Sequence, residues 1–341
     1  MALATTVLDE YRLSVESSNL DVAENRFAVY GAYATALKDR ENLIPGYQEF
    51  ITGRASAART ASIVVQQKFT PTSSATRSCV ANTEEETTAY VTPSWTTIET
   101  GFMMVPAQNM GNYVSYQGQI NNQMKGVERV FLEAVDTAVV THLDANKTTT
   151  NAADGNPFTA SGNSMMVLLA DHDIYLNELH QIYMQNDYEI SDMNVVASPR
   201  ASSIFRQLYN QGIGNSSNTA YQFAGFNLAF TNNIVVSATN DIAVLYSMPV
   251  GTLAYLSWID IDAKIGSTIG GVSEWTTTLL PKLGHEVGVY YTAACADKSA
   301  LLTGLNRTKA DSWEFSFDFT VISSYISAGA APIFRACFHS V

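Results

Sequence analysis

The sequence predicts an α+β fold, because it contains both helical and strand-forming stretches. Three observations lead to this prediction. Apolar residues recur every three or four positions over residues 108–143, residues 51–105 are rich in Thr, Ser and β-branched residues, and polar and apolar residues alternate over residues 313–322. With 341 residues, of which 46% are hydrophobic, the chain can form one large core or two lobes.

The first 50 residues are expected to form an N-terminal arm and not a core element. A helix is predicted over residues 21–40 and is ended by Pro45 and Gly46. Residues 51–106 then predict a long β-hairpin, because β-branched runs at 63–65 and 90–92 flank a polar middle.

The clearest helix is predicted over residues 108–143. A helix of about 33 residues within this range spans roughly 50 Å, which is longer than helices of globular proteins usually are. Such a helix is expected to be a strut on which other elements pack. Its apolar face is formed by Tyr113, Tyr116, Ile120, Met124, Val127, Phe131, Val135, Ala138 and His142.

A compact α/β region is predicted to follow. Ser198 and Pro199 are expected as the N-cap and first residue of its second helix. The predicted order is a helix at 171–185, a strand at 193–197, a helix at 201–210, and strands at 227–230 and 234–237.

Residues 242–259 carry no charge, which raises the question of a membrane span. Pro249 and Gly251 lie in the middle, and neither end is flanked by Lys or Arg, so two strands joined by a turn are predicted instead, at 242–248 and 252–259. The remaining strands are predicted at 276–280, 285–292, 313–322 and 333–338.

The charge balance bears on function. Charged residues make up 15% of the chain, against about 25% in an average soluble domain. The 19 Lys and Arg residues and 32 Asp and Glu residues leave a net charge of −13, which disfavours binding nucleic acid by neutralising its phosphates. So low a charge is typical of broad surfaces that are buried against partners.

No catalytic or cofactor-binding motif is present, so neither an enzyme nor a cofactor is expected. Cys79, Cys295 and Cys337 form no CxxC pair, and free thiols in a reducing compartment are expected. Two arrangements leave metal chemistry open as the lesser alternative. One is a site at His172 and His180, and the other is a metal-dependent hydrolase that uses Asp260, Asp262 or His285.

The order of elements is specific: an arm, a long hairpin, a very long helix, an α/β region and a β-rich return. Within the α/β region, Asn194 to Arg200, then Phe205 to Leu208, then Tyr221 to Phe226 read as a strand, a capped helix and a returning strand. This order resembles the major capsid proteins of tailed double-stranded-DNA bacteriophages, which have the HK97-like fold. The stretches 77–91 and 109–147 look most similar to capsid proteins of phages that infect Bacteroidota.

The resemblance implies a domain layout. Residues 1–50 would be the N-terminal arm, 51–106 the E-loop hairpin and 107–170 the peripheral domain with its spine helix. Residues 171–275 would be the axial domain, and 276–341 a β-rich return to the peripheral domain. No Lys–Asn crosslinking pair can be matched residue by residue. The stretch before residue 50 is short for a cleaved scaffold domain, so a separate scaffold or none is expected.

The resemblance also implies partners. Copies of the chain would form pentamers and hexamers of an icosahedral shell, with portal, scaffold or decoration proteins as further partners and double-stranded DNA enclosed without sequence-specific binding. The chain would be part of the virion, assembled in the host cytoplasm, with no membrane contact. An encapsulin-like compartment shell is the main alternative. The candidate assembly contacts are Lys68, Arg77, Glu84, Glu85, Glu86, Asn215 and Asn218.

Overall fold

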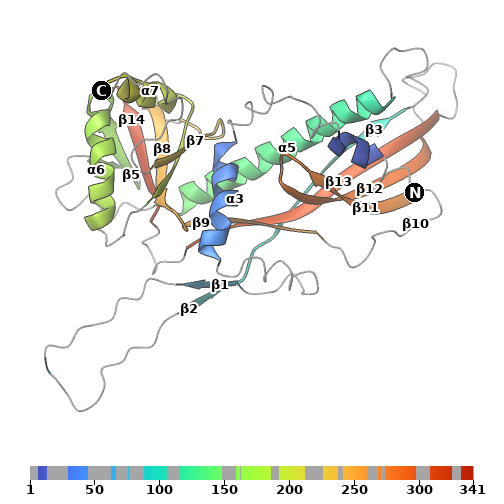
Figure 1. Ribbon diagram of the computed structural model, residues 1–341, viewed down its shortest axis with the longest axis horizontal. Coiled ribbons are helices and arrows are strands. Elements are labelled where there is room, and N and C mark those ends of the chain that lie inside the picture. Colours follow the sequence, from blue (N-terminus) through green and yellow to red (C-terminus); the bar gives the residue numbers. More distant parts are fainter. Residues whose placement is uncertain are drawn as a thin grey trace. The chain divides into compact units, whose positions relative to one another are not determined.

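The computed structural model describes residues 7–13, 30–44, 63–66, 76, 88–105, 116–147, 159–161, 163–185, 192–211, 226–236, 241–259, 268–269, 273–296, 308–324 and 332–340. The chain divides into two compact units (Figure 1). Unit 1 comprises Met1–Phe27, Trp95–Val135 and Ser257–Thr320, and unit 2 comprises Ala28–Ser94, Asp136–Leu256 and Val321–Val341. Each unit therefore combines segments that are far apart in sequence.

Unit 1 is built on an antiparallel sheet in the order β10-β11-β12-β13-β3. The polar and apolar alternation predicted near residue 315 lies on β13, its longest strand. The strands are β3 (Thr96–Met104), β10 (Thr268–Ile269), β11 (Ser273–Leu280), β12 (His285–Ala296) and β13 (Thr308–Ser323).

The core of unit 1 lies between this sheet and the long helix α5 (Tyr116–Ala145), of which the residues up to Val135 belong to the unit. Alternate β13 side chains, Trp313, Phe315 and Phe317 among them, are buried. The rings of Phe131 on α5 and Phe317 meet edge to face, with centroids 4.9 Å apart. The apolar period of the predicted helix thus reflects its packing on a sheet.

Unit 2 is built on a mixed sheet in the order β4-β5-β14-β8-β6-β7. β14 is parallel to β5, β7 is parallel to β6, and the other neighbours are antiparallel. The strands are β4 (Thr159–Ser161), β5 (Ser164–Leu168), β6 (Met193–Ala197), β7 (Phe226–Phe230), β8 (Asp241–Pro249) and β14 (Phe334–His339).

Two helices, α6 (His172–Gln185) and α7 (Ala201–Gln211), pack with one face of this sheet in a single hydrophobic core. A short 3-10 turn, η3 (Leu169–Asp171), leads into α6. Tyr183 on α6 lies edge to face with Phe334, and its hydroxyl donates to Ser247 Oγ at 3.1 Å. The buried ring is therefore held by both an apolar and a polar contact.

Helix α3 (Gly31–Leu43) packs against β6 and β7. Its first residue must be glycine, because a Cβ at Gly31 would lie 2.5 Å from the carbonyl oxygen of Phe230. The predicted helix is confirmed from Gly31 to Arg40, and residues 21–29 lie outside the described part. The expectation that it lies apart from a core is wrong, because Ala32, Tyr33 and Ala36 are buried in unit 2.

The predicted hairpin is confirmed at its base. β1 (Ile63–Gln66) pairs antiparallel with β2 (Thr88–Val91), and Ile63 is opposite Val91. The segment after it differs from the prediction. Residues 96–104 form β3 and pair with β13, so they belong to the sheet of unit 1 and not to the hairpin.

The uncharged stretch is two strands, β8 and β9 (Leu253–Trp258), joined by a turn in which Gly251 has φ +86. A positive φ is strained for residues with a Cβ, so the glycine suits this turn. Of the helices in the described part of the chain, none has the length and hydropathy needed to cross a membrane.

The strand predicted at 234–237 is wrong over its described residues 234–236, which are not in a strand. Instead, Thr231 makes an isolated bridge with Tyr30, and Thr231 and Asn233 donate side-chain hydrogen bonds to Asp136. These bonds direct the chain away from a hairpin.

Candidate functional site

All seven candidate assembly residues lie outside the described part of the chain: Lys68, Arg77, Glu84, Glu85, Glu86, Asn215 and Asn218. Their role stays a prediction. Asp260 and Asp262, proposed as alternatives for metal chemistry, also lie outside it.

The histidines considered for metal chemistry make ordinary contacts. His172 Nδ1 lies 2.7 Å from the Leu169 carbonyl oxygen, and the His180 ring lies edge-on to Phe226. His285 Nδ1 lies 2.8 Å from the Glu286 carbonyl oxygen, and its ring contacts Phe317. Within the described ranges, no three His, Cys, Asp or Glu residues are grouped so that they could hold a metal ion.

Cys337 is a buried free thiol on β14. Its burial raises the pKa of the thiol, so the thiolate is disfavoured.

The polar groups that sequence reasoning missed are three buried carboxylates. Each accepts backbone N–H groups from a distant part of its own unit. Asp39 on α3 is 2% exposed and accepts from three consecutive residues of the β8–β9 turn: Gly251 N at 2.6 Å, Thr252 N at 3.0 Å and Leu253 N at 3.1 Å. Asn42 Nδ2 donates a fourth bond at 3.2 Å. The carboxylate therefore ties α3 to this turn.

Asp136 on α5 is fully buried in unit 2. One oxygen accepts from Tyr33 N, 2.9 Å away, in the first turn of α3. Backbone N–H groups of a first helical turn have no partner within the helix, and Tyr30 at the N-cap makes no side-chain cap bond, so Asp136 takes the place of a cap. The other oxygen accepts from Thr231 Oγ1 and from Asn233 Nδ2 at 2.8 Å. Burial raises the pKa of Asp136, although these hydrogen bonds act in the opposite direction.

Glu128, two turns earlier on α5, plays the corresponding part in unit 1 and is 1% exposed. It accepts from Lys282 N, 2.6 Å away in the β11–β12 turn, and from Tyr11 Oη at 3.0 Å. Burial raises the pKa of Glu128. Burial of the Tyr11 hydroxyl, together with the adjacent Glu128 carboxylate, raises the pKa of Tyr11. Glu128 follows Val127 and Asp136 follows Val135, two residues of the predicted apolar face of the helix. An acidic residue beside that face was the sequence signal for each buried carboxylate.

Asp144, near the end of α5, joins a partly exposed ionic group in unit 2. It lies 2.7 Å from Lys147 Nζ and 3.6 Å from Arg335 Nε, and it accepts from Tyr246 Oη at 2.8 Å. Burial favours the neutral acid, but the hydrogen bonds and the two cations outweigh it and lower the pKa of Asp144.

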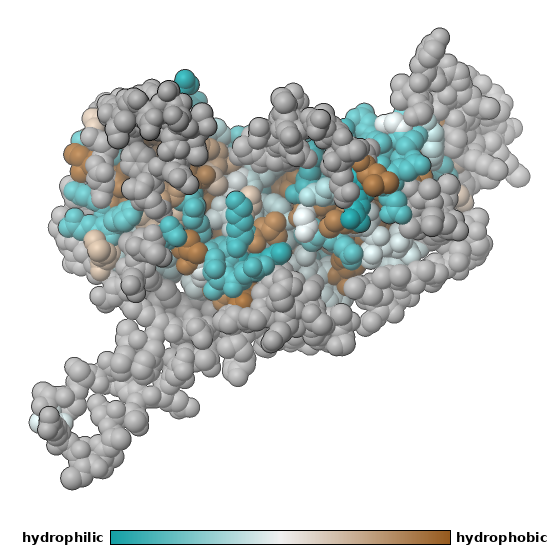
Figure 2. Space-filling model, in the orientation of Figure 1, coloured by the Kyte–Doolittle hydropathy of each residue, from teal (hydrophilic) through white to brown (hydrophobic). Residues whose placement is uncertain are grey.

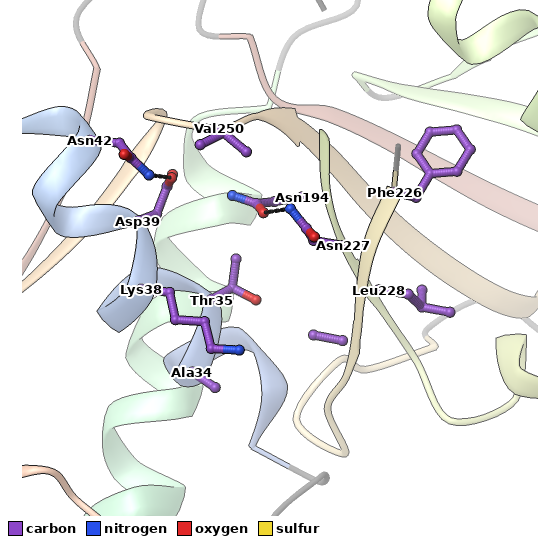
Figure 3. Close-up of a pocket in the computed structure, with 11 residues that line it drawn as sticks. Ala34, Thr35, Lys38, Asp39, Asn42, Asn194, Phe226, Asn227, Leu228 and Val250 are labelled. Atoms are coloured by element: carbon purple, nitrogen blue, oxygen red, sulfur yellow. Dashed lines mark hydrogen bonds between the residues drawn. The ribbon is translucent and has the colours of Figure 1, made fainter. Parts of the chain in front are cut away.

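A cleft of about 600 Å³, lined by both polar and apolar side chains, lies between α3 and the strands β6 and β7 (Figure 3). We call it the α3 cleft. Asn194 and Asn227, register partners on the two strands, form its floor, and Asn227 Nδ2 donates to Asn194 Oδ1 at 3.3 Å. Figure 3 shows both amides on the α3 side of the strands, whereas Phe226 and Leu228 point to the opposite side. The lining residues are Ala34, Thr35, Lys38, Asp39, Asn42, Asn194, Phe226, Asn227, Leu228, Ala229 and Val250.

Several large apolar side chains are exposed in each unit. Figure 2 shows hydrophobic residues in brown beside hydrophilic residues in teal on the face it presents. Within unit 2, Met184 on α6 is 60% exposed and Val235 is 74% exposed. Isolated apolar residues are normal on monomer surfaces. These positions are therefore available to partners without marking a patch by themselves.

No protein-family model and no curated protein matches the sequence. Solved structures do match. A structure of Mycobacterium phage Che8 is 13% identical, with 90% of each chain covered and a TM-score of 0.51. The capsid asymmetric unit of Cyanophage A-1(L) is 12% identical over 83% of this chain and 90% of that chain, with a TM-score of 0.48. The capsid structure of the Cyanophage P-SCSP1u is 10% identical over 84% of this chain and 85% of that chain, with a TM-score of 0.46.

At such identities a likeness shows the fold alone. The likeness to the Mycobacterium phage Che8 structure covers nearly all of both chains. It confirms the α+β, HK97-like fold that the order of elements predicted.

Proposed function

We propose that the chain is the structural subunit of an icosahedral capsid shell, and that the shell encloses the double-stranded DNA genome of a tailed bacteriophage. One observation supports this most strongly. The chain shares its fold, over 90% of its length, with a structure from Mycobacterium phage Che8. In this proposal the protein is a virion component whose role is structural and not enzymatic.

The partners in this proposal are copies of the chain itself, arranged in pentamers and hexamers. The hairpin that begins with β1 and β2 is the E-loop that reaches a neighbouring copy, with Glu84, Glu85 and Glu86 near its tip. Lys68, near the base of the hairpin, and Arg77 are proposed as further contacts with that copy, and the loop with Asn215 and Asn218 is proposed to face a symmetry axis. Residues 107–170 and 276–341 contribute to the peripheral domain, and 171–275 form the axial domain. Of the predicted arm, residues 1–50, the segment that forms α3 packs in unit 2 and is not a free arm.

The net negative charge of the chain is consistent with a shell that encloses DNA. A shell that is filled with DNA and later emptied must not bind DNA tightly along its inner surface. The net charge of −13 provides repulsion of phosphates in place of attraction. Assembly in the host cytoplasm, a Bacteroidota host, and portal, scaffold or decoration partners are finer parts of the same proposal.

The content of native particles tests the proposal against an encapsulin-like compartment, which would share the fold. Particles that contain the chain are purified, treated with nuclease to remove external nucleic acid, and then opened. We expect protected double-stranded DNA of one genome length. Particles that contain an enzyme and no protected DNA would support the compartment instead.

A further inference from the structure

We propose that the α3 cleft binds an extended segment of a second copy of this chain, with an Asp or Glu of that segment beside Lys38. This inference rests on the proposed function, because it names a contact between subunits of the shell. It depends on three features of the cleft: a nearly buried amide with an unused donor, a paired donor and acceptor on adjacent strands, and a cation at the rim.

The first feature is Asn194, which is 6% exposed. Its Oδ1 accepts from Asn227 Nδ2, whereas its own Nδ2 donates to no other side chain among the described residues. Asn194 Nδ2 is not one of the fully buried side-chain atoms that lack a partner, so it is open to the cleft. A molecule bound in the cleft would shield it from water and would have to supply an acceptor, because buried polar groups in proteins are almost always paired.

The second feature is the geometry of the amide pair. Because Asn227 Nδ2 donates to Asn194 Oδ1, the Nδ2 of Asn194 remains as a donor and the Oδ1 of Asn227 remains as an acceptor. The two side chains extend from register partners on parallel neighbours, which lie about 4.8 Å apart. A residue in an extended chain presents its N–H and C=O to the same side. The pair is therefore matched to one extended backbone residue, whatever its side chain.

The third feature is Lys38, the only Lys or Arg among the described residues that line the α3 cleft. Figure 3 shows its side chain extending from α3 in the direction of β7. The other charged lining residue, Asp39, accepts four hydrogen bonds, three of them from the β8–β9 turn, so both of its oxygens are already used. An anionic side chain bound in the cleft would therefore pair with Lys38 and not compete for Asp39.

The occupant follows from charge. A chain with 32 acidic and 19 basic residues offers many acidic segments, and in a shell the neighbouring copies hold such segments at high local concentration. The acidic residues of a neighbouring copy can therefore pair with the exposed Lys38. The proposal commits to a second copy for this reason.

Zero-length crosslinking with a carbodiimide tests the contact, because the reagent joins a lysine amine to a carboxylate only where the two touch. Shells are assembled from an equal mixture of ¹⁴N- and ¹⁵N-labelled subunits, and crosslinked peptides are identified by mass spectrometry. We expect mixed-isotope peptides that join Lys38 to an Asp or Glu in shells, and none in unassembled subunits. The variant Lys38→Arg keeps the charge and should assemble but lose this crosslink.

Two further variants separate the contact from folding. Asn227→Ala removes one member of the amide pair at an exposed position, so the subunit should still melt cooperatively while the yield of the Lys38 crosslink falls about tenfold. Lys38→Glu should lower the yield of shells about tenfold, whereas Lys125→Glu, the same charge reversal at an exposed position of α5, should not.

The outcomes are distinct. Normal shells with no mixed-isotope crosslink at Lys38 would overturn this inference and leave the capsid function standing. Crosslinks within one isotope only would show that the occupant belongs to the same copy, which also overturns it. If no shell forms under any condition, the proposed function fails and this contact fails with it.

Discussion

The Asp136 carboxylate on α5 accepts a hydrogen bond from the backbone N–H of Tyr33 on α3, 2.9 Å away and 103 residues earlier in the sequence. Together with Glu128 and Asp39 it forms a pattern that is repeated in both units. In each case a buried carboxylate on a helix accepts backbone N–H groups of a helix start or a tight turn. These N–H groups have few other partners. Although the chain has few charged residues, three of its carboxylates thus connect elements that are distant in sequence.

Replacing Asp136 by Asn should destabilise unit 2 by about 3 kcal/mol. The amide has nearly the same shape, but it turns one acceptor oxygen into an NH₂ group that faces other donors. Urea unfolding of the unassembled subunit measures the effect. Asp192→Asn, the same substitution at an exposed position, is the control and should change stability by less than about 0.5 kcal/mol. Equal stabilities of the two variants would contradict this account of Asp136.

Glu128 should make stability depend on pH in a defined direction. Burial raises the pKa of Glu128 above the ordinary 4.5. At a pH between the unfolded and folded pKa values, the folded state therefore keeps a proton that the unfolded state has released. The stability that protonated Glu128 contributes is fully present below the unfolded pKa and is lost as pH rises through the folded pKa. Glu128→Gln has no such proton. The stability of the wild type minus that of the variant should therefore fall as pH rises from 4.5, by up to about 1.4 kcal/mol per pH unit. Urea midpoints across this range measure it, and a rising difference would refute the assignment.

Two glycines should respond to alanine with opposite signs. Gly251 has φ +86 in the β8–β9 turn, so Gly251→Ala should destabilise by about 1–2 kcal/mol. Gly126 lies within α5, and a Cβ there would meet nothing within 4 Å, so Gly126→Ala should stabilise by about 0.5–1 kcal/mol through helix propensity. Thermal melts of the two variants provide the comparison, and a shift in the same direction for both would be inconsistent with these backbone roles.

Deletion of residues 80–90 tests the proposed E-loop. The unassembled subunit should keep its circular dichroism spectrum and its melting behaviour, because the cores of both units are formed by other elements. Shell formation should be lost, because the deleted residues would reach a neighbouring copy. Electron microscopy of the variant beside the intact chain measures this, and normal shells from the variant would show that the hairpin is not needed for assembly.

Most elements were predictable because they leave local periodic signals. The long helix, the strands near residues 195 and 315, and the two paired runs of the hairpin all follow from the spacing of apolar or β-branched residues. The order of strands was not predictable, since the position of β14 between β5 and β8 depends on contacts more than 80 residues apart. The prediction of a strand at 234–236 was wrong for the same reason. Thr231 and Asn233 donate hydrogen bonds to Asp136, which is distant in sequence, and no local pattern predicts these bonds.

The candidate site was predictable only in part. The seven assembly residues came from a resemblance and lie outside the described ranges, so their contacts stay predictions. The α3 cleft was missed because its floor joins Asn194 to Asn227, 33 residues apart, and its wall comes from a helix expected to be an arm. Asparagine within a strand gives no signal that it will face another asparagine across a cleft.

Cryo-electron microscopy of the purified full-length chain under assembly conditions tests the central claim most directly. We expect closed icosahedral shells in which each subunit has the fold described above and pentamers and hexamers surround the symmetry axes. A protein that stays monomeric, with no rings, sheets or shells across ionic strength, crowding agents and added scaffold, would contradict it.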